Sequence, residues 1–182
     1  MSERSAARRS LAFFQASEAT PLGPETMATA AVDEAVQAGL SRLAGLKVTR
    51  GLGEMNLLLF KESGCAGDEG FSLVYLWFKS GYVLPPHSHD GHCLYYVIGG
   101  ELHIGNRILR KGDGMFVPAG CAYTYEAGLQ GVEVLEFRNA TRFNIELKGN
   151  EGGRWDRVAA AFRERAAIWE TETLPPSERT GK

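Results

Sequence analysis

The chain has 182 residues, of which 44% are hydrophobic and 23% are charged, with 20 Lys and Arg against 22 Asp and Glu. This length fits a single domain that can bury a core without disulfides. A net charge of −2 provides no overall electrostatic attraction to nucleic acid or to an anionic membrane, so we expect neither as a partner.

Three further features concern the compartment. The longest apolar run of the central region, Leu73 to Phe78, is far shorter than a membrane span. No segment has the apolar core of a secretory signal. The three cysteines, Cys65, Cys93 and Cys121, form no CxxC pair. We therefore predict a reduced, cytoplasmic protein.

Residues 1–25 are predicted to form a flexible N-terminal arm, because they are rich in Ser, Ala, Arg and Glu and end in the turn-forming Pro21–Pro24. The arm also carries Leu11, Phe13 and Phe14, an apolar cluster that is sticky if left bare. Packing of this cluster on a partner subunit is the alternative to a solvated tail.

Apolar residues at helical spacing predict one helix before and one helix after the central region. The N-terminal helix is expected over residues 26–45, and the C-terminal helix over 153–173, followed by a tail at 174–182. Pro175-Pro176 ends the second helix. The apolar stripes consist of Val32, Val36, Leu40 and Leu43 in the first helix and of Trp155, Val158, Ala159, Phe162, Ala166 and Trp169 in the second.

Residues 48–147 consist of short apolar segments divided by Gly, Pro, Asn or Asp, a pattern that predicts the strands of an all-β sandwich or barrel. Glu101–Ile104 and Arg107–Arg110 are separated by Gly105-Asn106 alone. This spacing predicts a tight hairpin.

All four histidines lie in this region, and three of them, His87, His89 and His92, fall within six residues. In a strand, positions i and i+2 point to the same face, so His87 and His89 can enter one cavity. Clustered imidazoles indicate a metal site, because neutral imidazole is a common ligand of transition metals.

Two spaced patterns surround the histidines. The first reads Gly81-x5-His87-x-His89-x3-Cys93-x6-Gly100, and the second reads Gly112-x5-Pro118-x-Gly120-x2-Tyr123. Together they resemble the two motifs of the cupin superfamily. The resemblance implies a mainly β fold: a single double-stranded β-helix, or jelly-roll, barrel with one N-terminal and one C-terminal α-helix. It covers 81–127 by motif and about 48–147 by strand pattern.

The sequence departs from the cupin motifs at three positions. Cys93 stands where the family has its metal-binding glutamate, Tyr123 where it has its second-motif histidine, and Ala127 where it has asparagine. The resemblance therefore implies a metal held by His87 and His89, with other residues completing the ligand set.

Alternation along the strands selects the residues that accompany the histidines. Cys93, Tyr95 and Val97 are expected to face inward, which makes Tyr95 and Val97 pocket-lining residues, and Tyr123 and Tyr125 are expected to share an inward face. Cys93 can ligate a metal only as thiolate, and Tyr123 only as phenolate.

A different ligand set adds His92 and one carboxylate to the histidine pair. The candidate carboxylates are Glu101, Glu133 and Glu136. The metal is expected to be one divalent transition ion, Fe, Mn, Ni or Zn. Cysteine dioxygenases of the cupin superfamily also carry cysteine at the first-motif glutamate position, but this chain lacks their second-motif histidine.

Three functions remain open. The first is a small-molecule oxidoreductase of dioxygenase type that uses the metal held by His87 and His89. The second is a metal-dependent isomerase or lyase in which Tyr123 or Tyr125 is the catalytic acid or base. The third is a small-molecule binding or sensing module without catalysis. In each case the partner is a small molecule, and the protein is expected to form a homodimer.

Overall fold

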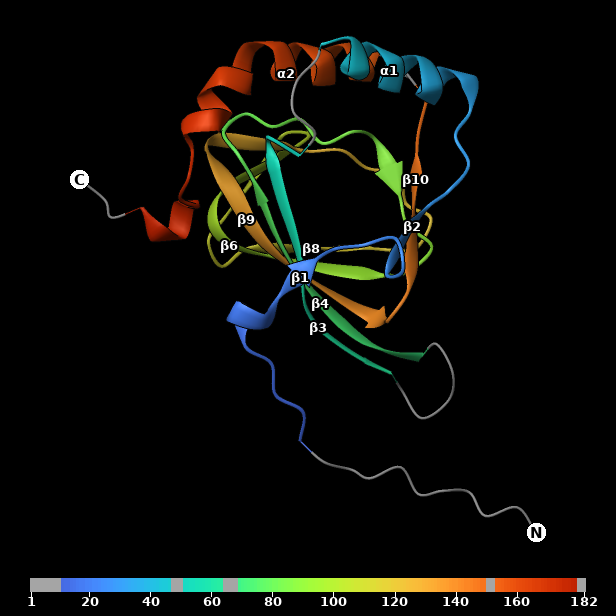
Figure 1. Cartoon of the computed structure of the whole chain (residues 1–182), viewed down its shortest axis with the longest axis vertical. Coiled ribbons are helices and arrows are strands. Elements are labelled where there is room, and N and C mark those ends of the chain that lie inside the picture. The colour runs from blue at the N-terminus through green and yellow to red at the C-terminus, as the bar shows by residue number, and fades with distance from the viewer. Residues whose placement is uncertain (1–10, 47–50, 64–68, 150–152, 180–182) are drawn as a thin grey trace.

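The structure, a computed structural model, describes residues 11–46, 51–63, 69–149 and 153–179 (Figure 1). Its strands form two sheets. Seven of them follow the order β1-β3-β4-β9-β6-β7 with β8 also on β6, and three follow the order β2-β10-β5. The strands are β1 (Thr20–Pro21), β2 (Met27–Thr29), β3 (Glu54–Ser63), β4 (Glu69–Phe78), β5 (His87–Ser88), β6 (Cys93–Ile104), β7 (Arg107–Arg110), β8 (Gly114–Val117), β9 (Glu126–Ala140) and β10 (Phe143–Leu147). This mainly β architecture with two helices is the one the motifs predict.

The core lies between the sheets, and β6 shows why. Cys93, Tyr95 and Val97 are buried, whereas Leu94 and Tyr96, which alternate with them, are about half exposed. The predicted inward face of this strand is therefore confirmed. The predicted hairpin is also present, since β6 and β7 pair antiparallel up to their turn at Gly105-Asn106.

The two helices, α1 (Glu34–Gly45) and α2 (Arg154–Thr171), lie along one end of the sheets (Figure 1). Helix α1 begins eight residues later than predicted, because the Asp33 side chain accepts a hydrogen bond from the backbone N–H of Val36 at 2.8 Å and caps the helix there. The helices approach closely where Gly39 faces the ring of the fully buried Trp155. No helix in the described residues combines the length and apolarity needed to cross a bilayer.

The N-terminal arm is more ordered than predicted. Residues 1–10 lie outside the described residues, but β1 pairs with β3 and β2 pairs with β10, so residues 20–29 follow the edge of both sheets. Thr26 is buried, and Leu22 packs against the core. Leu11 and Phe13 stay exposed, whereas the Phe14 ring packs 5.6 Å from that of Phe60. Backbone pairing at a sheet edge orders this segment despite its polar composition.

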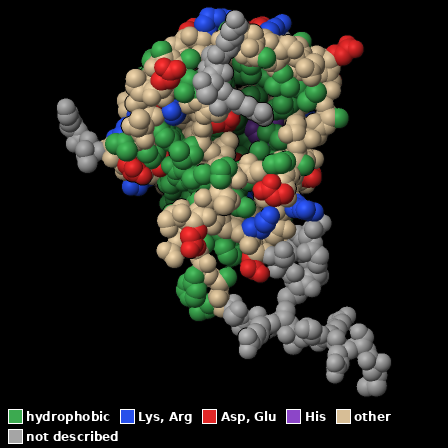
Figure 2. Space-filling model, viewed as in Figure 1, with side chains coloured by type: hydrophobic (Ala, Val, Ile, Leu, Met, Phe, Trp, Pro, Cys, Tyr) green, Lys and Arg blue, Asp and Glu red, His purple; other side chains and the backbone are tan. Residues whose placement is uncertain are grey.

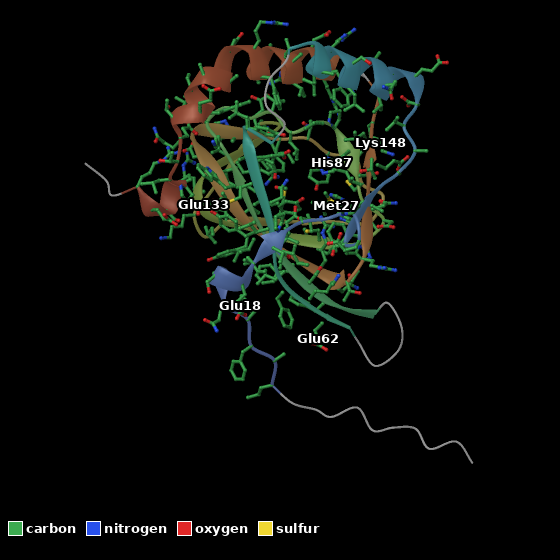
Figure 3. All side chains as sticks on the ribbon, viewed as in Figure 1. Glu18, Met27, Glu62, His87, Glu133 and Lys148 are labelled. Carbon is green, nitrogen blue, oxygen red and sulfur yellow. The ribbon has the colours of Figure 1, made fainter. Side chains whose placement is uncertain are left out.

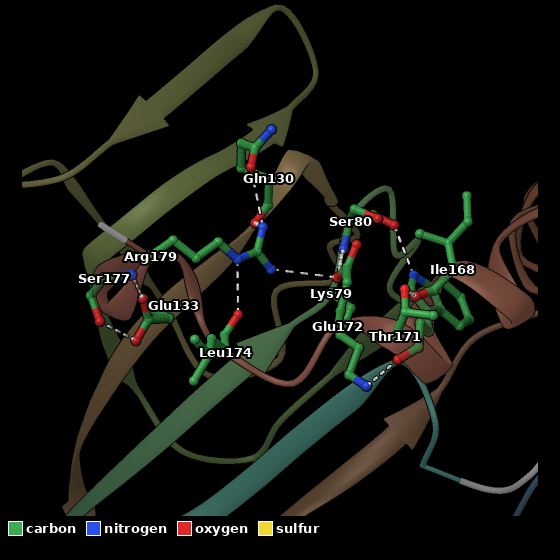
Figure 4. Close-up of polar contacts among 11 residues, drawn as sticks. Lys79, Ser80, Gln130, Glu133, Ile168, Thr171, Glu172, Leu174, Ser177 and Arg179 are labelled. Carbon is green, nitrogen blue, oxygen red and sulfur yellow. Dashed lines mark hydrogen bonds and ion pairs between the residues drawn. The ribbon is translucent and has the colours of Figure 1, made fainter. Parts of the chain in front are cut away.

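The C-terminal tail is also docked, through a short 3-10 turn at Pro176–Glu178. The buried Glu133 carboxylate accepts hydrogen bonds from the backbone N–H and the hydroxyl of Ser177, at 2.5 and 2.9 Å (Figure 4). Tyr75 donates a third bond to it at 2.8 Å. A Cβ on Gly99 would lie 3.1 Å from the Ser177 nitrogen, so the tail rests where β6 has no side chain.

Candidate functional site

A cavity of about 280 Å³ lies inside the barrel, between the two sheets. The space-filling view shows a hollow rimmed by hydrophobic side chains, with histidine visible at its bottom (Figure 2). Its wall is mostly apolar and includes residues of the N-terminal segment. The lining residues are Leu22, Met27, Thr29, Glu54, Asn56, Leu76, Phe78, Tyr82, Leu84, Pro85, His87, His89, Tyr95, Tyr125, Glu136, Ile145 and Leu147.

His87 and His89 both line the cavity, as the i, i+2 spacing predicts. Figure 3 labels His87 among the side chains of the barrel interior. Their ring centroids are 4.9 Å apart. The Nδ1 of His87 lies 2.8 Å from the Pro85 carbonyl oxygen, and the Nδ1 of His89 lies 2.5 Å from that of Asn144. A carbonyl oxygen can only accept, so each Nδ1 carries the proton and each Nε2 keeps its lone pair.

Both imidazoles are held in the neutral form. Burial, together with the neighbouring His89, lowers the pKa of His87 to about 4. Burial and the positive charge of Arg138 lower the pKa of His89. Neutral rings with anchored Nδ1–H groups are the form in which histidine binds a metal through Nε2.

Three tyrosines pack beside the histidines. The Tyr123 ring lies 4.4 Å from that of His87, and the Tyr95 and Tyr123 hydroxyls are hydrogen-bonded to each other. Among the described residues the buried Tyr125 hydroxyl has no hydrogen-bond partner, and this residue lines the cavity. Burial raises the pKa of all three phenols, so each is protonated at neutral pH.

Cys93 is buried on the same inward face of β6. Burial raises the pKa of its thiol, and the Glu136 carboxylate raises it further. The thiolate that a metal requires is therefore disfavoured, and the side chain serves as a small apolar group.

Glu136 is the one of the three candidate carboxylates that reaches the cavity. Glu133 binds the C-terminal tail, and Glu101 pairs with His103 and Arg110 on the outer surface. Burial raises the pKa of Glu136, but the Arg138 guanidinium, 3.0 Å from its carboxylate, brings the pKa below its ordinary value.

The structure does not bring His92 into the site. The His92 side chain is exposed, its ring stacks on Phe116 at 5.6 Å, and its Nδ1 accepts the backbone N–H of Ala119 at 3.1 Å. Val97 also departs from the prediction: it faces inward but belongs to the core and does not line this cavity.

Sequence reasoning missed Arg138 and the group formed by Glu54, Asn56 and Tyr82. Glu136 and Arg138 occupy i and i+2 on the inward face of β9, so a charged pair within an apolar strand was the available signal. Glu54 and Asn56 stand opposite Phe78 and Leu76, a register that no local pattern reveals.

The residues fit a metal only in part. Across the described ranges, no group of three or more His, Cys, Asp or Glu side chains is arranged to hold an ion. Glu136 is engaged by Arg138, and the predicted ligands Cys93 and Tyr123 do not line the cavity. The imidazole pair fits a metal whose other positions are filled by water or by a bound molecule.

Comparison with known proteins returns structures but no family model and no curated protein. KdgF from Halomonas sp. is 22% identical, with 48% of this chain and 79% of that chain covered and a TM-score of 0.41. An RmlC-like cupin from Shewanella frigidimarina NCIMB 400 is 25% identical, with 53% of this chain and 87% of that chain covered and a TM-score of 0.42. The polyketide cyclase RemF from Streptomyces resistomycificus is 17% identical, with 57% of this chain and 77% of that chain covered and a TM-score of 0.45. The structures that this chain is similar to thus include a cupin.

Proposed function

We propose that this protein is a metal-dependent enzyme that acts on a small, largely apolar molecule bound in the barrel cavity. The observation that carries the proposal is the anchored imidazole pair. His87 and His89 each donate Nδ1–H to a backbone carbonyl and stay neutral, so both Nε2 atoms are available to one divalent transition metal. A metal bound there would polarise an oxygen of the substrate.

The protein's own contribution is protonated phenols beside a mostly apolar cavity wall. The free Tyr125 hydroxyl can donate to a substrate oxygen, and it stays a donor because burial raises its pKa. The Tyr95 and Tyr123 rings lie 6.2 and 6.3 Å from that of Tyr125, and the Arg138 charge, together with the Tyr95 hydroxyl, keeps the pKa of Glu136 below its ordinary value. These features favour acid–base chemistry, as in an isomerase or lyase, with Tyr125 as the acid.

A dioxygenase-like oxidoreductase is the second candidate function. It is favoured by the small number of protein ligands, because a metal held by His87 and His89 alone keeps several positions open for substrate and oxygen. The identity of the bound metal distinguishes the two functions. Bound iron would favour the oxidoreductase and call for oxygen-uptake assays, whereas zinc or nickel would favour the isomerase or lyase and call for assays with substrates of those enzymes.

Metal content, measured by mass spectrometry on protein purified without chelator, tests the proposal. We expect close to one metal ion per chain in the wild type and loss of the metal in the His87→Ala/His89→Ala variant. His92→Ala is the matched control and should retain the metal, because that ring lies outside the cavity. A wild type that binds no metal after reconstitution would refute the enzyme and leave a binding module, whose ligand affinity the double variant should not change.

A further inference from the structure

The end of the cavity away from the histidine pair carries a second polar group, formed by Glu54, Asn56 and Tyr82. Glu54 and Asn56 extend from β3 opposite the buried Phe78 and Leu76, so their side chains face the barrel interior. The Tyr82 hydroxyl donates to Oε2 of Glu54 at 3.2 Å, and Nδ2 of Asn56 donates to the same oxygen at 3.3 Å.

This group offers acceptors that no described residue satisfies. The Oδ1 atom of Asn56 is buried and has no hydrogen-bond partner in the described structure. Both hydrogen bonds to Glu54 reach Oε2 and come from neutral donors, which leaves its other oxygen open. No Lys or Arg of the described ranges forms an ion pair with Glu54, so the charge of this half-buried carboxylate at the cavity wall is uncompensated there.

The opposite end of the cavity has the reverse arrangement. There the Glu136 charge is balanced by Arg138 at 3.0 Å. The Tyr125 hydroxyl, which has no hydrogen-bond partner among the described residues, lies between the two ends, because the Tyr82 and Tyr125 rings both pack on Phe78. The wall between the two ends is apolar and consists of Leu22, Met27, Leu76, Phe78 and Leu84. A matching ligand therefore has a donor group at the Glu54 end and an apolar body that extends from it along this wall.

We propose that the Glu54 end of the cavity binds the ammonium group of an amine ligand, whose apolar body extends toward His87 and His89. The inference rests on the proposed function only in taking the cavity as the substrate site. An ammonium group has three donors and no acceptor, so it can satisfy both Glu54 and Asn56 Oδ1 and also neutralise the carboxylate. A hydroxyl has one donor and no charge, and a carboxylate is repelled.

Binding of three probes of equal length, hexylamine, hexan-1-ol and hexanoate, tests this inference by calorimetry on the full chain at neutral pH. Protein treated with chelator is measured first, so that the amine cannot bind through a metal, and zinc-loaded protein second. We expect hexylamine to bind about tenfold more tightly than the alcohol, and hexanoate to bind most weakly.

Substitutions at the polar group locate the effect. Glu54→Gln should weaken hexylamine binding about tenfold and leave hexan-1-ol nearly unchanged, because it removes the charge and keeps the shape. Glu62→Gln is the matched control: it lies on the same strand, is exposed, and does not line the cavity (Figure 3). Asn56→Leu removes the buried acceptor without adding charge and should weaken the binding of hexylamine. It replaces Glu54→Gln if that variant does not fold.

Equal affinity for the three probes, or unchanged hexylamine affinity in Glu54→Gln and Asn56→Leu, would overturn the inference. This outcome is separate from failure of the proposed function. If the protein binds no metal but binds the amine more tightly than the alcohol, the proposed function is refuted and the amine inference is supported. If the protein binds metal through His87 and His89 but binds the amine and the alcohol equally well, the proposed function is supported and the amine inference is refuted.

Discussion

The neutral state of His87 makes the stability of the fold depend on pH in a defined direction. Burial and the neighbouring His89 lower the pKa of His87 from its ordinary 6.5 to about 4 in the folded protein. Between these pH values the unfolded chain binds a proton at this position and the folded chain does not. The contribution of His87 to the free energy of unfolding is therefore constant above pH 6.5, and the folded state loses stability as the pH drops from 6.5 toward 4.

The size of the effect follows from the shift. The difference between 6.5 and about 4, at about 1.4 kcal/mol per pKa unit, corresponds to about 3 kcal/mol lost by pH 4. His89 adds a loss in the same direction, because its pKa is also lowered. A substitution that removes the titrating ring of His87 should abolish its share of this stability loss and leave the share of His89.

His87→Asn is the suitable variant, because its amide nitrogen can still donate to the Pro85 carbonyl that receives Nδ1–H. Urea unfolding of chelator-treated protein, followed by tryptophan fluorescence between pH 7 and pH 4, measures the free energy of unfolding. The stability difference between wild type and variant should shrink by about 3 kcal/mol across this range. His92→Asn, at an exposed ring, is the control and should follow the wild-type curve.

The reasoning is refuted if wild type and His87→Asn lose stability in parallel as the pH falls. That result would show that the ring is protonated at the same pH in both states.

Two further predictions concern the buried charged pair and the docked tail. Arg138→Met should destabilise the fold by about 3–5 kcal/mol in urea unfolding, because it leaves the Glu136 carboxylate buried without its cation. The double variant Glu136→Gln/Arg138→Met should recover most of this loss, and equal losses in the single and double variants would contradict the explanation. Gly99→Ala should cost about 1–3 kcal/mol, because its Cβ would lie 2.5 Å from Oε2 of Glu133 and 3.1 Å from the Ser177 nitrogen that this carboxylate binds. Gly45→Ala, where a Cβ meets nothing within 4 Å, should be neutral or stabilising, and a matching loss there would exclude tail displacement as the cause.

Features governed by local periodicity could be predicted from the sequence. Alternation placed His87 with His89 and put Cys93 and Tyr95 on the buried face of β6, because side chains of a strand repeat every two residues. The hairpin at Gly105-Asn106 followed from its two-residue turn. Each of these features depends only on residues close together in the chain.

The features that were missed depend on residues far apart in sequence. Residues 27–29 carry no strong strand signal and form β2 where β10 offers them a partner, so they are not part of α1, which begins after the Asp33 cap. His92 follows His89 closely, yet it turns out of the barrel to meet Phe116 and the loop after β8. Its proximity in sequence therefore did not place it in the site.

The sequence by itself thus determined the mainly β fold, the spacing that resembles the cupin motifs and the histidine pair, because short-range periodicity encodes which face of a strand is buried. Only the tertiary structure decided what surrounds that pair. It brought Arg138 beside Glu136 and placed Glu54 and Asn56 at the far end of the cavity. The pairing of β3, β4, β9 and β6 sets these contacts, and a strand's register against its neighbours depends on the whole assembled barrel.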